Sequence, residues 1–106
     1  MQLSQKKCKP CEGGVPPLTE EQANELLKQI HEWTIQDGHV YRQFKFKDFK
    51  EAISFVNKVA DIAEQEDHHP NITINYNKVS IDLWTHAING MSDNDFILAA
   101  KIEEVI

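Results

Sequence analysis

Two pairs of short segments, in which apolar and polar residues alternate, constrain the fold of this chain more than any other feature. Residues 33–35 and 40–46 form the first pair and are joined through Asp37-Gly38, a dipeptide typical of hairpin turns. Residues 72–76 and 79–85 form the second pair, joined through Asn77 and Lys78. Alternation with a period of two predicts half-buried strands, and connections this short permit only antiparallel pairing. The sequence therefore predicts two β-hairpins.

Segments with helical periodicity precede and follow the hairpins. Thr19 with Gln22 forms a capping-box pattern at the start of the first helix, and Asp48 is a suitable N-cap for the second. Ser92 with Asp95 gives a similar pattern at the start of the last helix. The apolar stripe predicted for the second helix comprises Phe49, Ala52, Ile53, Val56, Ala60 and Ala63.

The order of elements is helix, two strands, helix, two strands, helix, within 106 residues. A chain of this length supports one domain with a sizeable core. An antiparallel sheet with one apolar face needs helices to cover that face. The pattern therefore predicts an α+β fold, with a four-stranded antiparallel sheet covered by helices on one face. Residues 1–17 hold three of the four prolines and show no periodicity, so we interpret them as an irregular leader and residues 18–106 as the domain.

Charge and hydropathy argue against several classes of function. There are 11 Lys and Arg against 17 Asp and Glu, a net charge of −6, whereas a general nucleic-acid binder needs a basic surface. No apolar run approaches the roughly 20 residues of a membrane-spanning helix, so no membrane partner is expected. Residues 1–7 lack the apolar stretch of a secretory signal. Two cysteines without such a signal favour a cytoplasmic protein.

Three of the five histidines cluster around the second hairpin. His68 and His69 precede Pro70, which ends the second helix, and His86 lies near the end of the fourth strand. Because the start of one hairpin strand lies beside the end of its partner, the pair should lie close to His86. Strand parity places Trp84 and His86 on the face opposite the core, where Trp84 offers a flat surface to a planar ring. Histidine exchanges protons near neutral pH, so one interpretation is an acid–base site.

Other interpretations of these residues stay open. A histidine pair before a proline also suits a solvated helix C-terminus, and His86 also suits an ordinary surface position. Three histidines and a carboxylate could hold zinc, although the spacing is unlike familiar zinc motifs and adjacent side chains in an extended segment point opposite ways. Cys8 and Cys11 form half of a zinc or redox motif and are interpreted as a leader feature. His31 and His39 have no identifiable partner.

The spacing of the chemistry-bearing residues resembles a family signature. It reads Glu64-x3-His68-His69-Pro70-x5-Tyr76-x9-His86-x8-Asp95, with Gly90-Met91-Ser92 ahead of the last aspartate. This pattern is similar to that of the pterin-4a-carbinolamine dehydratases, and the likeness runs from about Leu18 to Val105. The leader, with Cys8-x-x-Cys11 and Pro16-Pro17-Leu18-Thr19, resembles that of bacterial members.

The resemblance implies a hydro-lyase that dehydrates 4a-hydroxytetrahydropterin to quinonoid dihydropterin. A proton must reach the hydroxide leaving C4a and another must leave N5, so histidines suffice and neither a nicotinamide cofactor nor a metal is implied. By position, His68, His69 and His86 match the family's catalytic histidines. His68 or His86 would be the acid, and His69 would orient the substrate or hold the second proton. The substrate-binding positions of the family match Glu64, Asp67, Trp84, Thr85, Ala87 and Asp95. Among them, Asp95 would position a histidine or a substrate hydrogen bond, and Glu64 would fix the loop from the preceding helix turn.

The resemblance also implies partners. The expected ones are a small-molecule pterin and further copies of the chain in a homodimer or homotetramer. A functional link to an aromatic amino-acid hydroxylase is expected, because hydroxylation precedes this dehydration. Some animal members serve as a dimerisation cofactor for a homeodomain transcription factor, so an interaction module is the alternative function. A metal-dependent hydrolase is a minor alternative.

Overall fold

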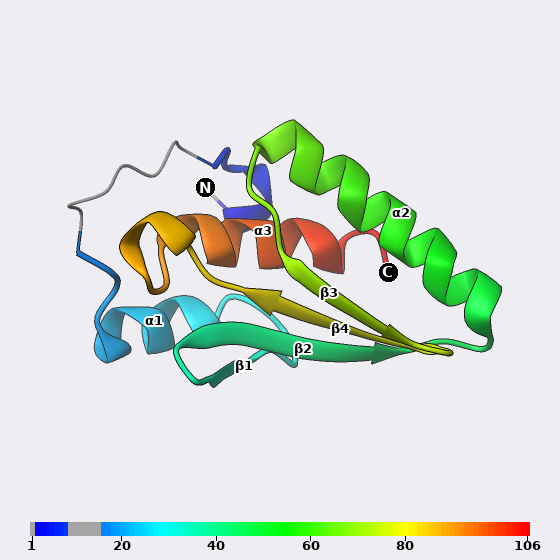
Figure 1. Ribbon diagram of the computed structural model, residues 1–106. Helices are drawn as coiled ribbons and strands as arrows, with labels where there is room; N and C mark the ends of the chain where they lie inside the picture. Colours follow the sequence, from blue (N-terminus) through cyan, green and yellow to red (C-terminus); the bar gives the residue numbers. More distant parts are fainter. Residues whose placement is uncertain (1, 9–15) are drawn as a thin grey trace.

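The two predicted hairpins join into one sheet in the computed structural model, which describes residues 2–8 and 16–106 (Figure 1). The strand order is β1-β2-β4-β3, and every neighbouring pair is antiparallel. The predicted four-stranded antiparallel sheet and the α+β class are therefore confirmed. The strands are β1 (Thr34–Gln36), β2 (His39–Lys45), β3 (Asn71–Asn75) and β4 (Lys78–Leu83).

The helices begin at the residues that the capping patterns predicted. Thr19 and Gln22 form a capping box, and the Asp48 carboxylate accepts a hydrogen bond from the Glu51 N–H at 2.9 Å. Among the described residues, no helix combines the length and the apolar character needed to cross a membrane. The helices are α1 (Glu20–Leu27), α2 (Phe49–Glu66) and α3 (Asp93–Glu103), with 3₁₀ turns η1 (Leu3–Gln5) and η2 (His86–Ile88).

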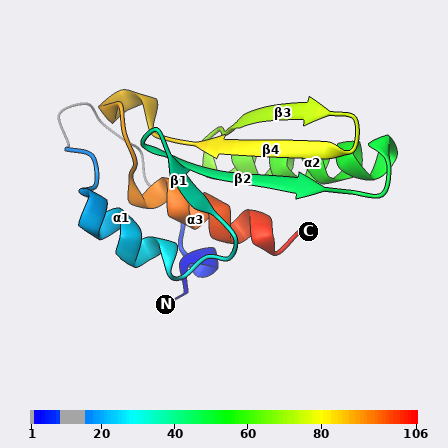
Figure 2. The same cartoon turned by 90° about the horizontal axis from the view of Figure 1, so that it is seen from below.

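Helix α3 lies at the centre of the molecule. It contacts α2, β2 and η1, and Figure 2 shows it between the sheet and η1. Its residues from Asn94 to Ala100 are all buried, because neighbours cover α3 on most sides. The sheet face toward the helices presents Val79, Ile81 and Leu83, which are completely buried as strand parity predicted. The core therefore forms between this face and α3.

The apolar stripe predicted for α2 is wrong at two positions. Phe49 is 49% exposed and Ala60 is exposed, whereas Phe55 and Val59 are buried. Two overlapping apolar stripes run along this helix, and periodicity alone cannot choose between them. Packing against β4 and α3 selects the stripe that contains Ala52, Phe55, Val59 and Ala63.

The second hairpin differs from its prediction at both ends. Asn75 pairs with Lys78, so the turn consists of Tyr76 and Asn77, one residue earlier than expected. Tyr76 adopts a φ of 55° in that turn instead of extending the strand. At the other end β4 stops at Leu83, and Thr85 forms an isolated bridge to Gly90. The bridge closes a short loop that contains the η2 turn.

Candidate active site

The C-terminal end of α2 places the histidine pair. The helix ends at Glu66, and Asp67 adopts the left-handed conformation with φ 50° and ψ 41°. The left-handed conformation costs about 1 kcal/mol for a residue that carries a side chain. Here it turns the chain back toward the sheet at the end of the helix. The backbone N–H of His68 donates to the Ala63 carbonyl at 3.2 Å and closes the turn. His68 and His69 therefore lie where α2 gives way to β3.

His86 begins the 3₁₀ turn η2 instead of ending a strand. The Thr85 N–H donates to the Gly90 carbonyl at 2.7 Å, which closes the loop around η2. Pairing of Asn71 with Asp82 sets the start of β3 beside the end of β4, as the hairpin argument predicted. The loop that carries His86 is thus adjacent to the segment that carries the histidine pair.

These two segments enclose a pocket of about 710 Å³, which His68, His69 and His86 line together. A volume of this size suits a small bicyclic molecule. The other described residues that line it between the end of α2 and the start of β3 are Gln65, Glu66, Asp67, Pro70 and Asn71. The remaining lining residues are Cys8, Trp84, Thr85, Ala87 and Asn94.

Asp95 lies behind the pocket wall and holds His68. Its carboxylate is completely buried, and Oδ1 accepts a hydrogen bond from Nε2 of His68 at 2.6 Å. Oδ2 accepts from the Ser92 N–H at 2.9 Å and from the Thr85 hydroxyl at 3.1 Å. A buried carboxylate needs such donors to offset its lost hydration. The arrangement fixes the plane of the His68 ring.

Glu64 holds His69 in a more open setting. Oε2 of Glu64 accepts a hydrogen bond from Nε2 of His69 at 2.7 Å. The side chains are 76% and 56% exposed, so water competes for this contact. Glu64 therefore constrains His69 less than Asp95 constrains His68.

Trp84 contacts two imidazole rings on the uncovered side of the sheet. The His39 ring stacks on it with centroids 4.0 Å apart and an interplanar angle of 7°. The His86 ring lies 4.4 Å away at 37°. Nδ1 of His39 lies 3.1 Å from Oδ1 of Asp82, which anchors the stack to β4. The surface that Trp84 was expected to offer a substrate is thus partly occupied by protein side chains.

His39 is the neighbour of the site that the sequence interpretation missed. The only signal for it is the pairing of β2 with β4, where Val40 lies opposite Leu83 and the preceding His39 therefore comes beside Trp84. Nothing within either hairpin indicates which of its strands will pair with the other hairpin. The contact follows from the assembled sheet.

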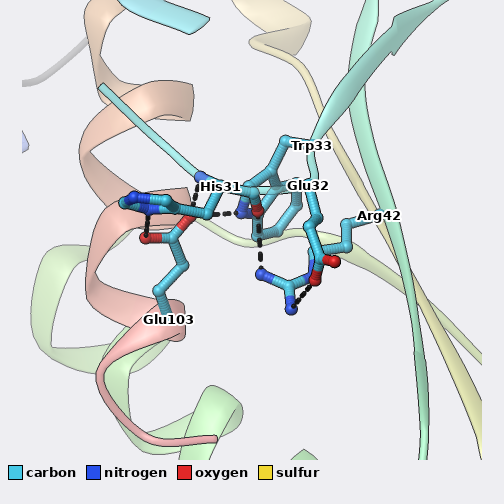
Figure 3. Close-up of polar contacts among 5 residues, drawn as sticks. All are labelled: His31, Glu32, Trp33, Arg42 and Glu103. Atoms are coloured by element: carbon cyan, nitrogen blue, oxygen red, sulfur yellow. Dashed lines mark hydrogen bonds and ion pairs between the residues drawn. The ribbon is translucent and has the colours of Figure 1, made fainter. Parts of the chain in front are cut away.

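His31 lies outside the pocket, in a polar cluster at the end of α3 (Figure 3). Oε1 of Glu103 accepts hydrogen bonds from the backbone N–H of His31 and from the Trp33 indole N–H. The Arg42 guanidinium donates to the His31 carbonyl at 2.9 Å and to the Glu32 carboxylate at 3.0 Å. The cluster connects the chain between α1 and β1 to both α3 and β2.

The metal-site alternative depends on how the candidate ligands group in space. Within the described ranges 2–8 and 16–106, no three or more His, Cys, Asp or Glu side chains gather in a way that could hold an ion. Cys8 lies at the pocket edge, where its N–H donates to Glu66 at 2.8 Å. Cys11 and the rest of the leader motif lie outside the described residues.

Comparison with known proteins identifies the family. The model of the family described as pterin 4 alpha carbinolamine dehydratase matches residues 16–105. The chain belongs to this family. A Rickettsia canadensis (strain McKiel) protein whose name refers to the same dehydratase is 53% identical over 106 residues, covering 98% of this chain and 97% of its own length. A Nitrosomonas eutropha protein named in the same way is 49% identical and covers 98% and 93%.

Solved structures agree with the fold of the pterin-4a-carbinolamine dehydratase family. A Brucella melitensis protein described as a transcriptional coactivator/pterin dehydratase superposes with a TM-score of 0.80 at 38% identity, covering 84% of this chain and 97% of its own. A pterin dehydratase-like protein described as a RuBisCO assembly factor of the alpha-carboxysome has a TM-score of 0.61 at 22% identity, covering 71% and 89%. The second likeness concerns the fold alone.

Proposed function

We propose that this protein dehydrates a 4a-hydroxytetrahydropterin to quinonoid dihydropterin by histidine acid–base catalysis. The observation that carries the proposal is the shared pocket of His68, His69 and His86, which lie on two segments of the chain. Membership of the dehydratase family supports the same reaction. All described residues that line the pocket except Cys8 lie within the stretch that the family model matches.

The reaction needs two proton transfers. The C4a–O bond breaks and the oxygen leaves as water after accepting a proton. The N5–H bond releases its proton to a base, and its electron pair forms the C4a=N5 bond, so the ring system gains no net charge. Each assisted transfer contributes typically about 10²–10⁴-fold in rate. Three histidines supply enough groups for both.

The contacts of the histidines suggest how the roles divide. Nε2 of His68 and Nε2 of His69 each contact a carboxylate, so a proton exchanged with substrate would pass through Nδ1 of these rings. Asp95 positions His68, and Glu64 positions His69. His86, whose ring packs against Trp84, would serve as the partner of His68 in the two transfers. His68 or His86 is the proposed acid.

The charge of the pocket suits an uncharged pterin. The described residues that line it include Glu66 and Asp67, and no Lys or Arg is among them. Such a lining would repel a strongly anionic ligand. The amide and carboxylate oxygens of Asn71, Asn94 and Asp67 are suitable acceptors for the amino-pyrimidinone edge.

The deciding experiment is dehydration of freshly prepared 4a-hydroxytetrahydropterin with wild-type, His86→Ala and His31→Ala protein. The wild type should exceed the spontaneous rate, and His86→Ala should lose about 10²-fold or more of that acceleration. His31→Ala is the matched control, because its side chain lies outside the pocket and is 83% exposed. A wild-type rate equal to the spontaneous rate would refute the proposal. Loss of activity with EDTA would favour a metal-dependent enzyme over histidine acid–base catalysis.

A role as an interaction module is the second candidate, because the Brucella melitensis structure is described both as a coactivator and as a dehydratase. The two candidates differ in their dependence on the pocket. An interaction module acting as a transcriptional cofactor would bind its partner equally well after His68→Ala and His86→Ala. Partner binding and dehydration measured on the same variants separate the two functions.

We also propose that the protein acts as a homodimer or homotetramer in the cytoplasm, beside an aromatic amino-acid hydroxylase that supplies its substrate. The strand β3 lies at one edge of the sheet, where an unpaired strand is open to a second chain. Ile74 on this strand is 41% exposed. Light scattering measures the molar mass of the wild type and of Ile74→Lys, and the variant should be smaller if the β3 edge forms the interface. A monomeric wild type would contradict the proposed homo-oligomer.

A further inference from the structure

Residues 2–8 of the leader reach the pocket although they precede the region that the family model covers. That match begins at residue 16, yet Cys8 lines the pocket together with the three histidines. We infer that Cys8 forms a wall of the substrate site that sets its affinity for the pterin, and that residues 2–7, docked on α3, hold Cys8 against Glu66. This inference rests on the function proposed above and adds a segment to it.

Two contacts dock the leader on α3. The turn η1 lies against α3 (Figure 2). Its residue Leu3 is 4% exposed and belongs to the main hydrophobic core. Burying a leucine contributes roughly 1.5–3 kcal/mol, which favours the docked position of the segment. Lys101 of α3 donates a hydrogen bond from Nζ to the Ser4 carbonyl at 2.9 Å. The backbone of the leader is thus fixed before it reaches the pocket.

Glu66 connects the docked leader to the active-site turn. Its Oε1 accepts a hydrogen bond from the Cys8 N–H at 2.8 Å, and its Oε2 lies 4.0 Å from Nζ of Lys101. The Glu66 side chain is only 9% exposed, so its carboxylate depends on these partners. Glu66 is the last residue of α2, immediately before Asp67 and His68. Undocking the leader would remove one pocket wall and release this carboxylate.

The same geometry predicts which kinetic constant depends on the leader. Oδ1 of Asp95 holds His68, while its Oδ2 accepts from Ser92 and Thr85, none of which belongs to the leader. The orientation of His68 should therefore survive undocking. The leader should determine how well the pterin is held, which appears in KM, and contribute little to kcat.

The test uses the full chain with two variants that undock the leader from outside the pocket. Leu3→Ser removes the buried anchor, and Leu3→Ala shortens that anchor without placing a polar group in the core. Gln5→Ala is the control, because Gln5 is exposed in the same segment. Hydrogen exchange of the Cys8 amide reports docking, and thermal unfolding reports whether the domain is intact. If Leu3→Ser unfolds the domain, the milder Leu3→Ala variant provides the test.

We expect the undocking variants to exchange the Cys8 amide faster and to raise KM about threefold or more, with kcat within about twofold of the wild type. Gln5→Ala should match the wild type in all three measurements. If the Cys8 amide exchanges faster but KM is unchanged, the leader does not set the affinity for the pterin, and the inference is refuted. The proposed function is unaffected by that result. An inactive wild type would defeat the proposed function. In that case the Kd of a stable pterin is measured for the wild type and for the undocking variants. An unchanged Kd after undocking, or no binding by any of these proteins, would refute the proposed effect of the leader on affinity.

Discussion

Nε2 of His68 lies 2.6 Å from Oδ1 of Asp95, although 27 residues separate them in the chain. The aspartate is also the third residue of α3, where its other oxygen caps the helix by accepting from the Ser92 N–H. One buried carboxylate thus links the start of the central helix to a pocket histidine. A rigid, completely buried support of this kind keeps a side chain in one orientation.

Asp95→Asn tests this support. The amide keeps the shape of the carboxylate but loses its charge and presents a donor on one side, so His68 would be held in a different tautomer or released. We expect turnover to fall about tenfold or more, by comparison with the effect of replacing supporting carboxylates elsewhere. We also expect the free energy of unfolding to fall by about 1–3 kcal/mol, because buried donors lose their partner. Turnover assays and urea unfolding measure the two effects.

The control for that variant is Asp93→Asn, in the same first turn of α3 but exposed. It removes the same charge near the helix N-terminus without contacting His68. Equal losses of activity in the two variants would show that the helix terminus matters and the histidine contact does not.

Glu64→Gln should have a smaller effect than Asp95→Asn. The contact between Glu64 and His69 is largely exposed, and exposed pairs of this kind contribute about 0–1 kcal/mol. We expect an unchanged melting temperature and a loss of turnover of less than about tenfold, because the amide retains an acceptor oxygen and water already competes for this exposed contact. Steady-state kinetics at matched substrate concentrations measure the difference. A larger loss than in Asp95→Asn would mean that His69 carries more of the chemistry than His68.

His39→Ala tests the stacking on Trp84. Removing the imidazole leaves the indole without the ring that lies 4.0 Å from it, and such pairs contribute about 0.5–1.5 kcal/mol. We expect a decrease of that size in the free energy of unfolding and a changed tryptophan emission spectrum. His39→Phe keeps a stacking ring but loses the contact with Asp82. The interpretation requires that this variant restore most of the wild-type emission.

Glu103→Gln tests the polar cluster outside the pocket. Glu103 accepts hydrogen bonds from the His31 backbone and from the Trp33 indole, and its side chain is 17% exposed (Figure 3). The amide retains one acceptor oxygen, so we expect unfolding to become easier by about 1 kcal/mol with kcat unchanged. The neighbouring exposed Glu104→Gln should leave stability as it is. A drop in kcat without a drop in stability would connect this cluster to the active site.

The secondary structure could be predicted closely because its signals are local. Thr19 with Gln22 and Asp48 with Glu51 make their caps within one helical turn. The Asp37-Gly38 turn follows from its two residues, both of which adopt positive φ. The buried stripe of α2 was predicted less well, because Phe55 and Val59 are buried by elements distant in the sequence.

The part of the site that one hairpin determines could be predicted from the sequence. The histidine pair and His86 come together because β3 and β4 pair across a short turn. The contact of His39 with Trp84 and the approach of Cys8 to Glu66 depend on which strand joins which hairpin and on where the leader docks. These contacts join residues 45 and 58 positions apart, which no local pattern encodes.

By itself the sequence determined the helices, the hairpins and the set of histidines, since backbone caps, turn residues and alternation act over a few residues. Tertiary structure alone decided that Asp95 would reach His68, that His39 would stack on Trp84 and that the leader would border the pocket. The physical reason is that burial is a property of the assembled core. Only when α3 is enclosed by the sheet, α2 and η1 do its carboxylate and its neighbours acquire their partners.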